Sequence, residues 1–197
     1  MLKSLQRNTM SEFFKDDLIT LITFDKRFSE ANSSIAKRII SNNKLAKGNI
    51  IVEWAPFDWI EFPLEKDNCS VTVKCKRKQK NDAPFFSFYY NENVFYNHYQ
   101  WWEDNQSIIK KPIRNFLHDS YDPEFLIQDN LLNILKCTLF LKKQDCKILN
   151  LLPNVIIQHE NYRDDDKFIS YVKQHDITLS IQKHSKVLYN FQPDTYW

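Results

Sequence analysis

The spacing of apolar and polar residues predicts helices in the first part of this chain, strands in the middle, and helices with a final hairpin after that. Segment 9–22 opens with the T-x-x-E spacing of a capping box and continues with apolar residues at helical spacing. A second helix is predicted to start at Ser29 or Ser33 and to end at Asn42-Asn43.

The middle of the chain has the shorter period of strands. Val71 and Val73 alternate with Thr72 and Lys74, which is typical of a half-buried strand with one solvated face. The predicted strands, the last two of them paired as a hairpin, cover 50–54, 58–62, 70–76, 85–90 and 93–99.

Helical spacing returns after this aromatic region. A short helix is predicted to begin at Pro112, and Asp122-Pro123 marks the start of a long apolar helix that ends at Lys143. The remaining predictions are a buried strand over 155–157, a helix from Asp164, and a hairpin of 177–181 with 187–191.

This order of elements favours one compact domain over residues 1–197. We expect the α+β class, with a mainly antiparallel sheet packed against helices, because most of the predicted strands follow one another without an intervening helix.

Glycine content excludes several enzyme classes. Gly48 is the one glycine in 197 residues. Phosphate-binding loops, dinucleotide-binding turns and the nucleophile elbow of α/β-hydrolases each need glycines at fixed spacing. The deficit can reflect the codon bias of an AT-rich genome or a functional constraint, and the exclusion holds in both cases.

Charge, hydropathy and cysteine spacing constrain the partner and the compartment. The formal net charge of +2 gives no general reason to expect nucleic acid, and no apolar stretch approaches the length of a membrane span. We expect a cytoplasmic protein without a cofactor, because the chain starts without a signal peptide and its four cysteines form no C-x-x-C pair.

Aromatic residues are the first candidates for binding a partner. They concentrate between Phe85 and Trp102, and a hairpin buries only one of its two faces well. The alternative is that the protein core covers both faces. The predicted partner-binding residues are Trp54, Trp59, Tyr96, Tyr99, Trp101 and Trp102.

A basic run before this aromatic block suggests an alternative function in nucleic-acid binding. Cations bind phosphates and neighbouring rings stack on bases, although a solvated strand end would have the same composition. The residues concerned are Lys74, Lys76, Arg77, Lys78 and Lys80.

A third candidate site is a metal centre at His118, Asp119 and Asp122, which offer nitrogen and oxygen ligands within five residues. The competing interpretation makes Asp122 the cap of the long helix and places His118 at the end of the helix before it. A metal-dependent hydrolase is the function that this site would indicate.

These observations together favour a non-catalytic protein-binding module of the inhibitor, immunity or host-interaction type. Such proteins of a phage, plasmid or pathogen fit the AT-biased composition and the absence of site motifs. The partner would be another protein, with nucleic acid as the alternative.

Overall fold

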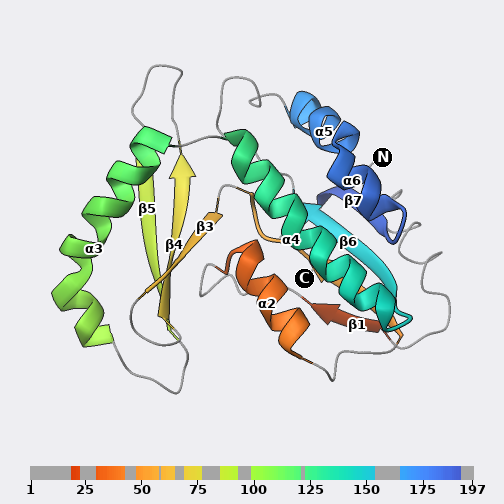
Figure 1. Cartoon of the computed structure of the whole chain (residues 1–197), viewed down its shortest axis with the longest axis horizontal. Coiled ribbons are helices and arrows are strands. Elements are labelled where there is room, and N and C mark those ends of the chain that lie inside the picture. The colour runs from red at the N-terminus through yellow and green to blue at the C-terminus, as the bar shows by residue number, and fades with distance from the viewer. Residues whose placement is uncertain are drawn as a thin grey trace.

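The computed structural model describes residues 19–22, 30–42, 48–57, 59–64, 69–76, 85–92, 99–120, 123–153 and 165–191. Two sheets form the framework (Figure 1). The larger sheet has four parallel strands in the spatial order β1 (Ile19–Ile22), β2 (Asn49–Glu53), β6 (Lys147–Pro153) and β7 (Lys186–Phe191).

The two central strands of this sheet are buried on both faces. All five residues of β2 are buried, and β6 is buried from Ile148 to Leu152. Ile50 pairs with Ile148, and Val52 pairs with Asn150. A nearly continuous apolar run is typical of a parallel strand, because helices and other segments cover both of its faces.

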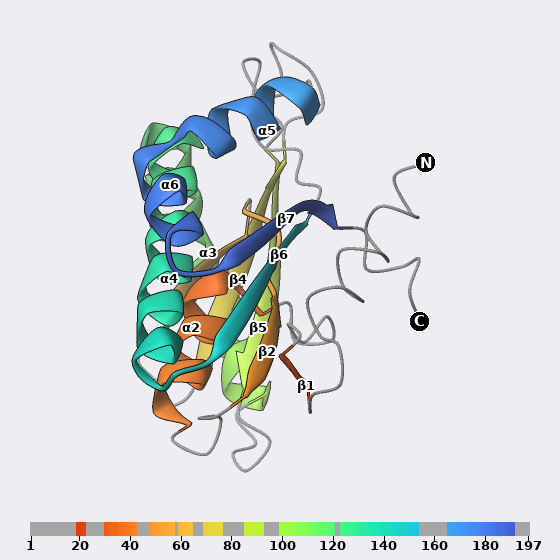
Figure 2. The same ribbon diagram turned by 90° about the vertical axis from the view of Figure 1, so that its right-hand side faces the viewer.

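Helices cover one face of the parallel sheet, as Figure 2 shows. The strands follow one another across the sheet in the order in which they occur in the sequence, so every crossover connection runs in the same direction. Because crossover connections between parallel strands are right-handed, their helices then lie on the same face of the sheet. These helices are α2 (Asn32–Ser41), α4 (Pro123–Lys143) and α6 (Asp176–Gln182), and α5 (Asp165–Gln174) packs on α6. Both α2 and α6 contact α4, which is therefore the middle helix of this layer.

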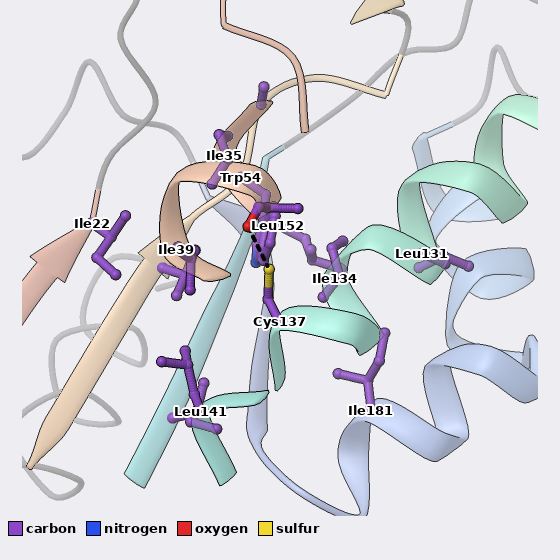
Figure 3. Packing of buried hydrophobic residues seen from close by; sticks show 14 of the residues in the cluster. Ile22, Ile35, Ile39, Trp54, Leu131, Ile134, Cys137, Leu141, Leu152 and Ile181 are labelled. Atoms are coloured by element: carbon purple, nitrogen blue, oxygen red, sulfur yellow. Dashed lines mark hydrogen bonds between the residues drawn. The ribbon is translucent and has the colours of Figure 1, made fainter. Parts of the chain in front are cut away.

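The main hydrophobic core fills the space between the parallel sheet and these helices. Figure 3 shows Ile22 of β1, Ile39 of α2, Leu141 of α4 and Ile181 of α6 converging there. The Cys137 thiol contacts the Ala36 carbonyl at 3.8 Å within the same core.

The second sheet is antiparallel and lies between β2 and β6 in the sequence. It consists of β3 (Trp59–Pro63), β4 (Cys69–Lys76) and β5 (Phe85–Glu92), and α3 (Tyr99–Ser120) packs on it. A smaller core joins them, with Val71 and Val73 of β4 against Trp102 and Leu117 of α3.

The prediction of a mainly antiparallel sheet is wrong, because the larger sheet is entirely parallel. Three local errors produced it. Residues 19–22 form a strand where a helix was expected, β6 was not predicted, and 177–181 lie in α6. The segment 187–191 therefore pairs with β6 in parallel and forms no hairpin with 177–181.

Other local predictions have mixed outcomes. The helix from Ser29 or Ser33 to Asn42, the strands over 50–54 and 58–62, and the long helix after Asp122 are confirmed within one or a few residues. Helix α3 begins at Tyr99, so Pro112 lies inside it and does not start it. Thr72 is buried, so this face of β4 is not solvated there. Segments 9–18, 93–98 and 155–157 lie outside the described residues.

Candidate functional site

Two of the aromatic residues predicted to bind a partner are core residues. Trp54 has no exposed surface, and its indole Nε1–H donates to the Oδ1 of Asn150 at 2.8 Å. Trp102 is only 5% exposed and lies in the core beneath α3. Neither ring is available to a partner in this fold, so both are removed from the predicted surface.

The remaining predicted aromatic residues are divided between the two cores and the undescribed part of the chain. Trp59 is half-buried against the main core, and Trp101 is half-buried against the smaller one. Tyr99 opens α3, while Tyr96 lies outside the described residues. The structure thus brings no cluster of these rings together at a common surface among the residues it describes.

Several residues of the predicted nucleic-acid and metal sites lie outside the residues that the structure describes. Lys74 and Lys76 lie in β4, opposite Ser87 and Phe85 of β5. The other three predicted nucleic-acid contacts, Arg77, Lys78 and Lys80, are in the undescribed segment after β4.

The predicted metal ligands lie where α3 ends. His118 and Asp119 belong to its last turn, and Asp122 lies outside the described residues. Within the described ranges, no three His, Cys, Asp or Glu residues are grouped closely enough to hold a metal ion.

One carboxylate, that of Glu61 in β3, is held by three serine hydroxyls. Ser33 donates to it at 2.8 Å and Ser70 at 2.6 Å, and Ser34 donates to both of its oxygens at 2.5 and 2.6 Å. Ser33 and Ser34 lie in the first turn of α2, where the helix dipole favours negative charge. The arrangement fastens the antiparallel sheet to α2, and the sequence interpretation did not foresee it.

Two buried amides fix the loop that follows β2. Asn32 accepts from the Ala55 N–H at 2.7 Å and donates to the Ala55 carbonyl at 3.0 Å and to Asn130 at 2.5 Å. Asn130 donates in turn to the carbonyls of Phe57 and Leu126. Ligands of open parallel sheets commonly bind at the carboxyl ends of strands where the strand order reverses. The order of the four described strands does not reverse, so these strands form no binding crevice of that kind. The loop after β2 is instead held by hydrogen bonds to α2 and α4.

One flank of α3 carries positive charge at the edge of the smaller core, over two of its aromatic rings. The Lys110 ammonium lies 5.2 Å from the centre of the Trp102 ring, and the Arg114 guanidinium lies 5.2 Å from that of Phe88. Lys111 is exposed next to them. No carboxylate forms an ion pair with these three cations in the part of the chain that the structure describes. An open groove here is lined by Glu103, Gln106, Ser107, Lys110, Lys111, Arg114 and Asn115.

The outer side of α4 carries a line of exposed apolar side chains. Phe125, Leu132 and Leu139 are 64%, 42% and 39% exposed, and they follow one another at intervals of seven residues. Residues seven apart lie on the same side of an α-helix, so the three side chains form one line, which we call the α4 stripe. Figure 1 views the molecule with α4 in front of β6.

The α4 stripe was missed in the sequence interpretation, although its spacing is visible there. The sequence predicts a long apolar helix here, and α4 contacts α2, α6 and β6 in the structure. These three neighbours leave the side of α4 that carries the α4 stripe exposed.

Comparison of the chain with protein-family models, with curated proteins and with solved structures finds no match. A membrane span would need a long and uninterrupted apolar helix, and the described residues contain none.

Proposed function

We propose that this protein is a protein-binding module whose contact surface is the α4 stripe. The supporting observation is that α4 carries large apolar side chains on its outer side as well as on the side that its neighbours cover. The outer side of a surface helix is normally polar. In α4 the inner residues Leu131, Ile134 and Leu141 are buried, whereas Phe125, Leu132 and Leu139 remain exposed.

Burial of the α4 stripe by a partner would be strongly favourable. Covering a fully exposed Leu or Phe side chain contributes roughly 1.5–3 kcal/mol, and these three are already partly covered. Large apolar side chains lined up on a rigid helix are typical of the anchors of a protein–protein interface. An inhibitor or immunity role for such a module stays a prediction.

The proposal is tested by co-purification. A tagged chain is co-expressed with an untagged copy of itself in the cell of origin, and the bound proteins are quantified by mass spectrometry. We expect a stoichiometric partner with the wild type and none with Leu132→Lys. Ile108→Lys is the matched control, because Ile108 is 71% exposed on α3 and lies away from the α4 stripe. An unchanged partner with a folded Leu132→Lys variant would contradict the proposal.

A second candidate function, the binding of single-stranded nucleic acid, is favoured by the cations along one flank of α3. Lys110, Lys111 and Arg114 have no carboxylate ion-pair partner among the described residues, and two of them lie over aromatic rings. Phosphate binding by such cations weakens with salt, because bound counterions are released.

The test of this candidate uses a fluorescent single-stranded oligonucleotide at several salt concentrations. Replacing Lys110, Lys111 and Arg114 together by Ala should abolish salt-dependent binding. The same triple replacement at the exposed residues Lys142, Lys143 and Lys147 removes equal charge elsewhere and should leave binding nearly unchanged. Equal losses in both variants would show that only the total charge of the protein matters.

A further inference from the structure

We propose that the partner seated on the α4 stripe is a second copy of this chain, with the two α4 helices antiparallel about a twofold axis near Leu132. This inference rests on the proposed function and names its partner. A twofold interface uses the same surface on both chains, so that surface must be complementary to itself. The α4 stripe meets this requirement in its shape and in its charge.

The apolar residues match under this symmetry. Leu132 is the middle member of the α4 stripe, with Phe125 seven residues before it and Leu139 seven residues after it. An antiparallel pair centred on Leu132 places Phe125 beside the partner's Leu139 and Leu132 beside the partner's Leu132. Each large ring therefore meets a smaller aliphatic side chain, and apolar residues repeating every seven positions are the pattern of paired helices.

The charges beside the α4 stripe also match in the antiparallel arrangement. Asp129 and Lys136 are both exposed, are seven residues apart and therefore lie along the same side of the helix. Asp129 accepts from the Asn133 amide, and neither Asp129 nor Lys136 forms an ion pair with any described residue. The twofold operation places Asp129 opposite the partner's Lys136, and Lys136 opposite the partner's Asp129. A parallel pair in register would place like charges together, which disfavours it.

The neighbouring helices supply further apolar surface. Stable interfaces bury on the order of 1,000 Å² or more, which is beyond what three side chains provide. Leu179 of α6 and Ile40 of α2 are 45% and 38% exposed, and both of these helices pack on α4. We therefore expect the interface to extend from α4 onto both flanking helices.

The first experiment measures the mass of the full chain by sedimentation equilibrium over a wide range of concentrations. We expect a reversible dimer of twice 23.8 kDa. Leu132→Lys, which brings two ammonium groups to the twofold axis, should be monomeric, whereas Ile108→Lys should dimerise like the wild type. Circular dichroism shows whether each variant is folded.

Charge exchange then tests the orientation. Asp129→Lys and Lys136→Asp should each weaken the dimer by about tenfold at low salt, because each turns two attractions into repulsions. The double variant should recover the wild-type affinity, and an equimolar mixture of the two single variants should form a mixed dimer. In a parallel pair the single substitutions would leave the existing repulsion unchanged, and that result would overturn the orientation.

Failure of this inference is distinguishable from failure of the proposed function. A chain that stays monomeric at all concentrations overturns self-pairing. If that monomer still binds another protein through the α4 stripe, the proposed function stands without the self-pairing. A dimer that survives Leu132→Lys overturns the α4 stripe as the dimer interface.

Discussion

The indole Nε1–H of Trp54 donates to the Oδ1 of Asn150, and this buried bond joins the residue that follows β2 to the middle of β6. The Nδ2 of the same amide donates to the Thr138 hydroxyl at 3.1 Å and to the Ser185 hydroxyl at 2.9 Å. Asn150 therefore connects two strands, the middle helix and the turn before β7 through one buried side chain.

Replacing Asn150 with Ala should lower the free energy of unfolding by about 2–4 kcal/mol. The substitution leaves the buried Trp54 N–H without its acceptor and also opens a cavity. Urea unfolding followed by tryptophan fluorescence measures the change. Asn133→Ala, which removes a partly exposed amide of α4, should cost less than about 1 kcal/mol. A loss at Asn150 no larger than the loss at Asn133 would contradict this prediction.

Asn32 and Asn130 should be energetically coupled, because one donates directly to the other and both hold the loop after β2. In a double-mutant cycle with Asn32→Ala and Asn130→Ala, we expect a coupling energy of about 1 kcal/mol. The control cycle pairs Asn130→Ala with Asn105→Ala on α3, and there the two losses should add within about 0.5 kcal/mol. Additivity in both cycles would mean that the two amides act independently.

The Glu61 carboxylate should stabilise the junction between the antiparallel sheet and α2. Glu61→Gln removes the charge that three hydroxyls solvate and that favours the first turn of the helix, so the free energy of unfolding should fall by about 1–2 kcal/mol. The exposed Glu103 of α3 is the matched control, and Glu103→Gln should change the free energy of unfolding by less than about 0.5 kcal/mol. Chemical denaturation measures both, and equal effects would show that the hydroxyl cluster adds nothing.

Burial raises the pKa of the Cys137 thiol from 9.0 to about 12, an effect that the nearby Lys136 ammonium partly offsets. The thiolate is the reactive form, so at pH 8.5 the folded protein should alkylate at Cys137 at least about a thousandfold more slowly than the urea-unfolded chain. Mass spectrometry of the Cys137 peptide measures both rates. Folded and unfolded rates within tenfold of each other would contradict the assignment.

The same pKa shift predicts how stability depends on pH. The unfolded chain releases the Cys137 proton near pH 9, whereas the folded chain keeps it until about pH 12. The stabilisation is therefore complete below pH 9 and is lost as the pH rises from 9 toward 12. Comparison with Cys137→Ala isolates this contribution from other groups, because the difference between the two proteins should shrink across that range.

Sequence patterns located elements with clear boundaries and failed where burial on both faces hides the period. Asp122-Pro123 marked the start of α4 correctly. The strand β6 was missed because its apolar residues Ile148, Leu149, Leu151 and Leu152, interrupted by Asn150, show no alternation of apolar and polar positions.

The opposite error occurred at α6. Ile177, Leu179 and Ile181 alternate as in a strand, but they lie in a helix whose inward residues, Thr178 and Ile181, are three apart. His175 caps this helix, because its Nδ1 accepts from the Ile177 N–H. A single short segment of seven residues can thus satisfy both periods, and only packing decides between them.

Binding surfaces were harder to predict than elements, because residue type does not reveal exposure. Trp54 and Trp102 were candidate anchors, yet both are buried. Phe125 and Leu132 belong to a helix predicted only as long and apolar, and they are exposed. Which apolar residues of a helix are exposed depends on where the neighbouring helices pack, and the sequence pattern of the helix does not contain that information.

The pairing of β2 with β6 has a consequence for how the chain folds. The Trp54–Asn150 hydrogen bond joins residues 96 positions apart in the sequence. The antiparallel sheet, α3 and α4 all lie between these two residues in the chain. Closing so large a loop is entropically costly, so this step should be slow and late. During synthesis the apolar residues of β2 leave the ribosome long before their partners exist, and until then they are exposed to aggregation and to chaperones.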